Sequence, residues 1–320
     1  MKKTKIMIWG YTSQSIVCEM FLLNSDIRDK YDYIGMYDRD ENTSGALKHK
    51  ITMEDMIIKK PEIILAVKSI LFSVKKDARE NSLMGTIEEI SEFITANIVF
   101  HRKAVSSGWG YNRWIYSTLK FLKSPVDNIF EIGANYGQDA NFIRQCFGVP
   151  ENKVFCFEAN PYIAKGGAKT YPGINIINKA VSNINGKVSL HIVDAEDENS
   201  GLSTVLDYEY TKNWRTIEVD CISMESYLNE HSEINSIDVL KIDVEGLNYE
   251  VLEGFGTKLG IVKSIQIESE FINYHEKHSF KDIVMFLYSM GFEMVDFTAL
   301  YRQNDSLWIR RDLLNTVPIY

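Results

Sequence analysis

Short apolar segments alternate with helix-compatible stretches along most of the chain, and many of the apolar segments end at a glycine or an acidic residue. The first two, residues 5–10 and 33–37, flank a helix-compatible stretch at 13–23, which is typical of the start of a β-α-β unit. Strands that alternate with helices through short connections predict an open α/β sheet. We therefore expect an α/β protein in which most strands are parallel.

A polar and aromatic segment at residues 101–116 interrupts this alternation. Before it we expect strands at 5–10, 33–37 and 63–67 and helices at 13–23, 52–59 and 88–96. After it the pattern restarts with strands at 128–132, 153–158 and 175–178 and helices at 138–147 and 162–170. We place a domain boundary near residue 104, which gives a smaller Rossmann-like domain at 1–104 and a larger domain at 105–320.

The second half of the larger domain contains two antiparallel signals. Asn185-Gly186 is a hairpin signal, and residues 188–193 and 216–219 are expected to be antiparallel. Parallel order resumes with strands at 237–242 and 264–269, joined through a helix at 248–252. A helix at 280–290 then precedes a final hairpin of 292–297 and 306–310, which predicts an antiparallel C-terminal edge.

Charge and composition exclude several classes of protein. The 320 residues carry a net charge of −9, nearly all of it after residue 100, which is the wrong sign for binding a nucleic acid backbone. No stretch approaches the roughly 18 apolar residues of a membrane span. Four cysteines without a C-x-x-C pair favour reduced thiols in a cytoplasmic protein. The composition is compatible with an oligomer.

Residues that can bind a ligand follow the strands of the larger domain, at the edge where open α/β sheets place their ligands. Gly133 and Gly137 allow the turn after the first strand to pass close to a ligand. Asn135 occupies the place of the glycine that admits a pyrophosphate, which favours a ligand without one. Glu158 follows Gly137 by about 20 residues, the reach at which a carboxylate accepts ribose hydroxyls.

Asp243 and Glu245 follow a further strong strand. A lone glycine turn or a lone acid at a strand end is often only a tight turn or a solvated side chain. Three strand ends that carry carboxylates around one crevice suit a ligand with positive charge and a ribose, and S-adenosylmethionine has a sulfonium, an ammonium and a ribose.

Four segments of the sequence resemble the FkbM-type S-adenosylmethionine-dependent methyltransferases. The resemblance rests on residues 129–137 (IFEIGANYG), 155–161 (FCFEANP), 180–186 (AVSNING) and 238–246 (DVLKIDVEG), in the order and spacing of that family. This chain has Glu131 where the family usually has Asp, and Ala159 where it commonly has Pro. The resemblance covers residues from about 110 to 310.

The resemblance implies a fold and a set of functional residues. The fold is a class I methyltransferase Rossmann-like sheet with an antiparallel C-terminal edge strand, and the activity is methyl transfer to hydroxyl oxygens, notably of sugars and polyketides. Glu158 would bind the ribose of the cofactor, and Asp243 would lie near the reacting methyl group. The methionine portion would be surrounded by Glu131, Gly133, Ala134, Asn135 and Gly137.

Methyl transfer to a hydroxyl is an in-line displacement, so a nearby base must take the hydroxyl proton. Asp243 is our first candidate for this base, and Glu245, Glu270 and His275 are further candidates. His275 lies in a polar run and can equally be a surface histidine. No His/Asp pair has metal-ligand spacing, so we expect no metal site.

The first domain is less informative. Gly10, Ser13 and Ser15 stand where a dinucleotide loop carries its glycines, and Asp38 stands where a ribose-binding acid would be. Such a degenerate loop fits a structural or interaction role, and it also fits a retained nucleotide or nucleotide-sugar site.

Two other functions are compatible with the sequence. A nicotinamide-dependent sugar dehydrogenase or epimerase would use the Tyr208-x-x-x-Lys212 pair, although this pair falls in the antiparallel region. A non-catalytic module that binds S-adenosylmethionine or a glycan is the second. We favour an O-methyltransferase whose acceptor is a saccharide or a related small molecule.

Overall fold

The computed structural model describes residues 2–25, 27–40, 49–97, 114–115, 117–118, 121–122, 125–192, 203–207, 210–270, 278–299 and 303–314. The chain divides into two compact units, unit 1 built mainly from residues 1–100 and unit 2 built mainly from residues 117–320. The expected boundary near residue 104 falls outside the described residues and stays a prediction.

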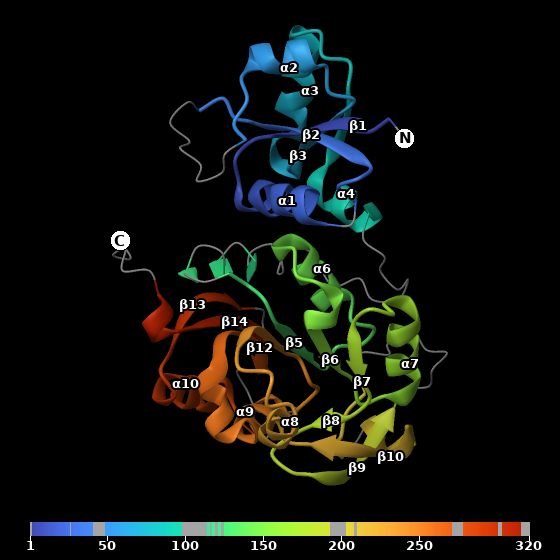
Figure 1. Cartoon of the computed structure of the whole chain (residues 1–320), viewed down its shortest axis with the longest axis vertical. Coiled ribbons are helices and arrows are strands. Elements are labelled where there is room, and N and C mark those ends of the chain that lie inside the picture. Colours follow the sequence, from blue (N-terminus) through green and yellow to red (C-terminus); the bar gives the residue numbers. More distant parts are fainter. Residues whose placement is uncertain are drawn as a thin grey trace. The chain divides into compact units, whose positions relative to one another are not determined.

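Unit 1 is a four-stranded parallel sheet between two helical layers (Figure 1). The strand order is β2-β1-β3-β4, with β1 at Thr4–Trp9, β2 at Tyr31–Tyr37, β3 at Ile63–Ala66 and β4 at Thr86–Glu89. One face is covered by α1 (Ser13–Asn24) and α4 (Ile90–Asn97), and the other by α2 (Met53–Lys59) and α3 (Leu71–Glu80).

Two elements of unit 1 were absent from the sequence prediction, namely α3 and β4. The helix expected at 88–96 begins two residues later, because Glu88 and Glu89 belong to the edge strand β4. Their side chains are half-buried there. Glutamate favours helices in isolated peptides, so the pairing of β4 with β3 overrides the local preference.

Unit 2 contains a seven-stranded sheet with the order β13-β14-β12-β11-β5-β6-β7. Six strands run in one direction, and β14 runs antiparallel to its neighbours β12 and β13, so the expected open sheet with an antiparallel pairing at its C-terminal edge is confirmed. The bounds are Ile129–Ile132 for β5, Val154–Phe157 for β6, Asn175–Ile177 for β7, Ile237–Ile242 for β11, Val262–Glu270 for β12, Phe292–Ala299 for β13 and Gln303–Arg310 for β14.

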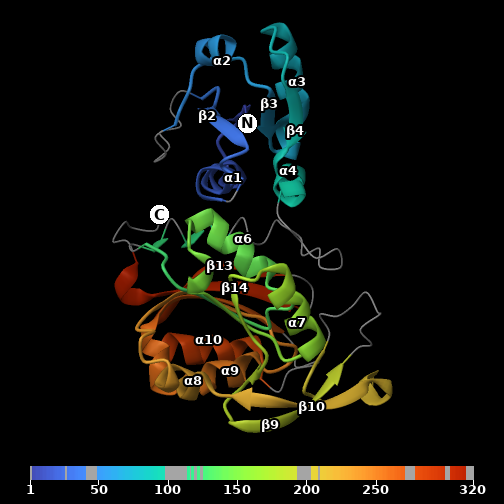
Figure 2. The ribbon, with the colours of Figure 1, turned by 45° about the vertical axis from the view of Figure 1, so that its right-hand side comes forward.

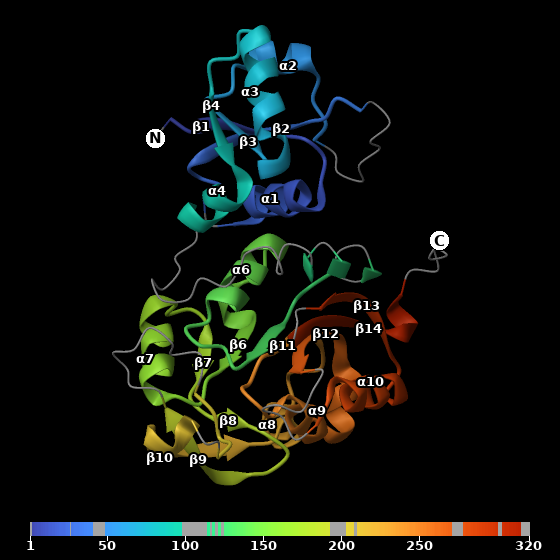
Figure 3. The same cartoon turned by 180° about the vertical axis from the view of Figure 1, so that it is seen from behind.

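Helices cover both faces of this sheet. On one face lie α6 (Gln138–Phe147) and α7 (Pro161–Thr170), and on the other α8 (Met224–Glu230), α9 (Asn248–Gly254) and α10 (Phe280–Ser289) (Figures 2 and 3). Asn160 caps α7 by accepting the Tyr162 N–H at 3.0 Å. A capping box of Ser279 and Asp282 starts α10.

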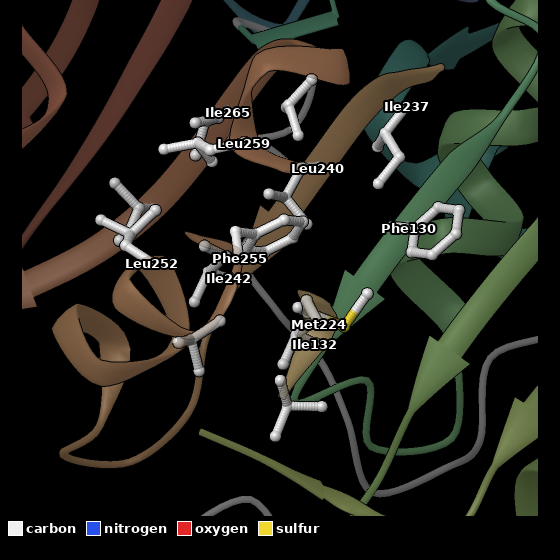
Figure 4. Close-up of a cluster of buried hydrophobic side chains, with 14 of the residues drawn as sticks. Phe130, Ile132, Met224, Ile237, Leu240, Ile242, Leu252, Phe255, Leu259 and Ile265 are labelled. Atoms are coloured by element: carbon white, nitrogen blue, oxygen red, sulfur yellow. The ribbon is translucent and has the colours of Figure 1, made fainter. Parts of the chain in front are cut away.

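The main core lies between the central strands and the α8–α10 layer (Figure 4). Ile132 and Ile242, the last residues of β5 and β11, are register partners, and both are almost fully buried. Leu252 and Phe255 pack on the same cluster from α9 and the turn after it. Burial therefore fixes the register of the strands, and the residues that follow them meet at one edge of the sheet.

A smaller three-stranded sheet has the order β8-β10-β9, with β8 at Ala180–Val181, β9 at Gly186–Ile192 and β10 at Arg215–Ile222. The predicted antiparallel pairing is confirmed between β9 and β10. The hairpin signal at Asn185-Gly186 was misleading, because β10 lies between β8 and β9. Asn185 instead accepts the Ser223 N–H at 2.9 Å and donates to Ser226 Oγ at 3.0 Å, which ties the turn to α8.

None of the helices in the described part of the chain is long and apolar enough to cross a membrane. Each of the four cysteines is free and buried.

Candidate active site

The adjacent parallel strands β6, β5, β11 and β12 bring their carboxyl ends to one edge of the seven-stranded sheet. Backbone hydrogen bonds join the segments that follow them. The Gly133 and Ala134 N–H groups both donate to the Phe157 carbonyl at 3.0 Å, and the Asp243 N–H donates to the Ile132 carbonyl at 2.9 Å. The strand ends after β5, β6 and β11 thus form one connected surface.

Gly133 allows the closest approach in this surface. Its φ is +81°, and a Cβ atom there would lie 1.9 Å from the Asp243 carbonyl oxygen. Any side chain would push the two strand ends apart. Asn135 and Gly137 also have positive φ values, +49° and +79°, so the turn from β5 to α6 is tightly curled.

Glu158 follows β6 and points its carboxylate at this turn. Its Oε2 accepts the Asn135 N–H at 2.9 Å, and its Oε1 accepts the Asn160 N–H at 2.7 Å. The side chain is 9% exposed. Burial raises the pKa of Glu158 to about 7, although the two backbone donors lower it. Each carboxylate oxygen keeps one lone pair for a ligand hydroxyl.

Lys241, which was not among the predicted site residues, lies at the centre of the acidic side chains. It is 3% exposed, and its Nζ is 3.3 Å from Glu131 Oε1, 3.3 Å from Asp139 Oδ2 and 2.9 Å from Asp243 Oδ2. The signal that could have found it is a lysine near the end of the fully buried strand β11, because a buried ammonium needs partners.

Glu131 is 1% exposed and is engaged inside the protein. Its Oε2 accepts the Ala140 N–H of α6 at 3.0 Å while Oε1 faces Lys241. Burial, joined by the charge of Asp139, raises the pKa of Glu131 against the opposing effect of Lys241. Glu131 therefore links Lys241 to the first turns of α6.

Asp243 and Glu268 form a pair of carboxyl groups across β11 and β12. Burial acts to raise the pKa of Asp243, but Lys241 and a hydrogen bond from Glu268 hold it below its usual value. Burial and the Asp243 charge raise the pKa of Glu268 far above its usual range, so of the two carboxyl groups Glu268 holds its proton more tightly and Asp243 ionises first. Glu268 was not predicted from the sequence, which pointed instead to Glu270, two residues later on the same strand.

Residues 203–207, which we call the strap, touch both sides of this edge. Thr204 Oγ1 donates to the Glu245 carbonyl at 2.7 Å, and Asn160 Nδ2 donates to Ser203 Oγ at 3.5 Å. Thr204 also forms an antiparallel bridge with His191 at the end of β9. The strap thus connects the segment after Glu158 with the segment after Asp243.

The structure therefore brings together Glu131, Gly133, Ala134, Asn135, Gly137, Glu158, Asp243 and the backbone of Glu245. His275 lies outside the described residues, as does the side chain of Glu270. Within the described ranges no group of three or more His, Cys, Asp or Glu side chains has the geometry of a metal site.

Two buried acceptor atoms near the turn lack partners. Asn135 Oδ1 and Gln138 Oε1 have no hydrogen-bond partner among the described residues. Unpaired buried oxygens are costly unless a ligand supplies a donor. At this edge Glu158 can therefore accept hydrogen bonds from a diol, and Asn135 and Gln138 can accept them from a donor such as an ammonium. The Asp243 carboxylate can accept a proton.

Comparison with protein families gives one match. The model described as the Methyltransferase FkbM domain matches residues 131–294, which include every described acid of the site. No curated protein matches the chain in sequence.

Solved structures of methyltransferases are similar to the chain at low sequence identity. Methyltransferase FkbM from Methylobacillus flagellatus is 11% identical with a TM-score of 0.40, over 96% of this chain and 90% of that one. The O-methyltransferase from Bacillus cereus in complex with SAH is 12% identical with a TM-score of 0.37, over 74% and 97%. Aeropyrum pernix fibrillarin, with natively bound S-adenosyl-L-methionine, is 11% identical with a TM-score of 0.36, over 60% and 72%.

Proposed function

The chain belongs to the FkbM family of S-adenosylmethionine-dependent methyltransferases, and we propose that it transfers the methyl group to a hydroxyl oxygen of a saccharide or a related natural product. The observation that carries this proposal is the pairing of two carboxylates at one sheet edge. Glu158 is held by two backbone N–H groups, and Asp243 is kept ionised beside Lys241. The Glu158 carboxylate can accept the hydroxyl groups of a ribose, and the Asp243 carboxylate can accept a proton.

The residues present fit the cofactor. Glu158 would accept the ribose hydroxyls, because both of its oxygens keep a lone pair beyond their backbone donors. Asn135 Oδ1 and Gln138 Oε1 would accept from the ammonium of the methionine portion. Gly133, Ala134 and Gly137 give the turn its close curl around that portion. The surrounding carboxylates favour a sulfonium cation.

S-adenosylmethionine, when bound, supplies a methyl group on positively charged sulfur, which keeps the electrons of the C–S bond as the acceptor oxygen forms the new C–O bond. Asp243 would take the proton of that hydroxyl at a carboxylate oxygen. Its lowered pKa still suits this role, because the hydroxyl oxygen gains a third bond and a positive charge as it takes the methyl group, and then loses its proton readily. Glu268, being protonated, would hold Asp243 in place by donating its hydrogen bond.

Glu131 and Lys241 are assigned to positioning, because both are almost fully buried. They orient Asp243 and anchor α6 at the turn that follows Gly133. We assign the acceptor side to the segment of Glu245 and the strap, which touch each other at Thr204. Glu270 and His275 remain candidates for the acceptor side.

No specific observation favours the dehydrogenase or epimerase. Tyr208 of the Tyr-x-x-x-Lys pair lies outside the described residues, and Lys212 lies in a 3₁₀ turn at Tyr210–Asn213. A non-catalytic binding module has no need for the adjacent carboxyl groups of Asp243 and Glu268 beside Lys241. We also place the enzyme in the cytoplasm, since its four free thiols suit a reducing compartment.

A labelled-methyl assay tests the proposed reaction. The protein is incubated with S-adenosylmethionine carrying a ¹³C methyl group and with pooled sugars and hydroxylated natural products, and the products are identified by mass and by the carbon-13 shift of the new methyl. We expect an O-methyl ether. Label found on nitrogen or carbon, with none on oxygen, would reject O-methylation.

Asp243→Asn is the matching variant. We expect it to lower kcat by about 10²- to 10⁴-fold, the usual contribution of a general base, while cofactor affinity stays within about tenfold. Asp220→Asn, at an exposed position on β10, is the control and should keep full activity. Undiminished turnover by Asp243→Asn would show that another group takes the proton.

A further inference from the structure

Unit 1 repeats the turn that forms the candidate cofactor site of unit 2. Gly10 follows β1 with a φ of +95°, and its N–H donates to the Tyr37 carbonyl at the end of β2, at 2.7 Å. Gly133 follows β5 with a φ of +81°, and its N–H donates to the Phe157 carbonyl at the end of β6, at 3.0 Å. The same link therefore joins the first and second strands of each unit.

The acid after the second strand makes the same two contacts in both units. Asp38 Oδ2 accepts the N–H of Tyr11, from the turn after β1, at 2.5 Å, and Oδ1 accepts the N–H of Asp40, two residues farther along, at 2.8 Å. Glu158 does the same with one N–H from the turn after β5 and one from two residues farther along. Asp38 is half-buried, so its remaining lone pairs are open to a ligand.

A buried glutamine with an unpaired amide atom is the third shared feature. Gln14, the second residue of α1, is 5% exposed, and its Nε2 has no hydrogen-bond partner among the described residues. Gln138, the first residue of α6, is 4% exposed, and its Oε1 is likewise unpaired. This observation is independent of the backbone turn, because an unpaired buried amide needs a partner from outside the described residues, such as a ligand atom or an ordered water.

The glycine of each turn is also packed against the segment that follows the neighbouring strand. A Cβ at Gly133 would collide with the Asp243 carbonyl after β11, and a Cβ at Gly10 would lie 2.5 Å from Ile70 Cδ1, after β3. One difference separates the turns. Helix α1 begins three residues after Gly10, whereas α6 begins five residues after Gly133, so the first turn is shorter and is matched to the shorter Asp38.

We propose that unit 1 carries a second ligand site, in which Asp38 accepts the vicinal hydroxyls of a ribonucleoside or its monophosphate; the comparison with Glu158 rests on the proposed function of unit 2. Counted from Gly10, the glycine that admits a pyrophosphate in a dinucleotide turn falls at Thr12, one residue before the Ser13 that the sequence comparison matched to it. The site therefore selects a nucleoside or a monophosphate over a dinucleotide or a nucleotide-sugar.

Calorimetric titration of the full chain with adenosine 5′-monophosphate and uridine 5′-monophosphate tests this site. The protein is first saturated with S-adenosylhomocysteine, so that the site of unit 2 is filled. We expect at least one monophosphate to bind 1:1 with a Kd below about 1 mM. Its 2′-deoxy counterpart should bind at least about tenfold more weakly, because one hydrogen bond to a charged carboxylate is lost.

Paired variants identify the site. Asp38→Asn should weaken monophosphate binding at least about tenfold and leave S-adenosylhomocysteine affinity unchanged, whereas Glu158→Gln should do the reverse. Asp32→Asn, at an exposed position on β2, is the control for removing one negative charge from the same sheet. The deoxy comparison uses the unaltered protein, so it stands even if Asp38→Asn fails to fold.

The proposal is overturned if neither monophosphate binds the saturated protein, if the deoxy forms bind equally well, or if binding survives in a folded Asp38→Asn protein. Its failure is distinct from that of the proposed function. Absence of S-adenosylhomocysteine binding rejects the site at Glu158, whatever happens at Asp38.

Discussion

The Nζ atom of Lys241 lies 2.9 Å from Oδ2 of Asp243, with the lysine side chain 3% exposed. Two further carboxylates, of Glu131 and Asp139, lie 3.3 Å from the same nitrogen. A single buried ammonium thus faces three acids, of which Asp243 is the proposed base. The arrangement makes the charge of Lys241 important for both stability and the pKa of Asp243.

Replacing Lys241 should therefore destabilise the protein strongly. Lys241→Met leaves the buried carboxylates of Glu131 and Asp139 and the partly exposed one of Asp243 without their cation, and we expect a loss of about 3–5 kcal/mol in the free energy of unfolding, measured by urea denaturation. Lys187→Met is the matched control, because Lys187 also lies 2.9 Å from a carboxylate, that of Glu218, but on the surface. Its loss should be about 0–1 kcal/mol. Equal losses would contradict the buried-cation account.

The pKa of Glu158, raised to about 7 by burial, predicts a pH-dependent affinity for S-adenosylhomocysteine. The ionised carboxylate is the form that accepts both ribose hydroxyls, so affinity should fall as the pH drops below about 7, by up to about tenfold per unit. Calorimetric titrations between about pH 5.5 and 8.5, a range that brackets the raised pKa, measure this change in affinity. Glu158→Gln cannot ionise, so its weaker affinity should show a flatter profile. A steep profile in that variant would assign the titration to another group.

The same raised pKa makes the protein less stable as the pH rises, whereas an acid whose pKa is lowered by folding makes a protein more stable. The folded protein holds the Glu158 proton more tightly than the unfolded chain, in which the carboxyl returns to its ordinary pKa of 4.5. As the pH rises, the unfolded chain loses this proton first. The contribution of Glu158 to the free energy of unfolding therefore falls above pH 4.5 and becomes constant above about pH 7. Urea denaturation of the wild type and Glu158→Gln across this range should show that contribution disappear in the variant.

Gly133→Ala tests the close approach of β5 and β11. The new Cβ would meet the Asp243 carbonyl at 1.9 Å, so the strand ends must separate, at a cost of about 1–3 kcal/mol beyond the strain of the positive φ. Gly291→Ala is the matched control, because Gly291 has a φ of +84° and no atom within 4 Å of the added Cβ. The difference between the two losses in unfolding free energy measures the collision, and no difference would contradict it.

Thr204→Val tests the strap. The change removes the hydrogen bond from Thr204 Oγ1 to the Glu245 carbonyl, and we expect KM for the acceptor to rise by about threefold to tenfold, the worth of one hydrogen bond. Affinity for S-adenosylhomocysteine should change little. Thr257→Val removes a similar hydrogen bond, to Glu225 at 2.8 Å, on the exposed side of α8 and should leave KM unchanged. If Thr204→Val changed only the affinity for S-adenosylhomocysteine, the strap would belong to the cofactor site and not to the acceptor site.

Much of this site could be read from the sequence because its key residues are local to strand ends. Gly133, Glu158 and Asp243 each follow an apolar run, and parallel strands in register bring those positions together. The order of the strands was not predicted, because β11 pairs with β5 although β6 to β10 lie between them in the sequence.

The roles of Lys241 and Glu268 could not be predicted from the sequence. Each lies inside a strand, and its meaning depends on which side chains of neighbouring strands face it. The Asn185-Gly186 turn does not form a tight hairpin for a related reason, since Asn185 is hydrogen-bonded to the start of α8 and β10 lies between β8 and β9. Tertiary pairing decided each of these cases.

Calorimetric titration with S-adenosylhomocysteine and with NAD is the most direct test of the central claim, that the sheet edge at Glu158 and Asp243 binds the methyl donor. The account predicts 1:1 binding of S-adenosylhomocysteine to the wild type. It also predicts a loss of about 1.5–3 kcal/mol in binding free energy for Glu158→Ala, and no binding of NAD at that edge. Binding of NAD without any response to S-adenosylhomocysteine, or unchanged affinity in Glu158→Ala, would contradict it.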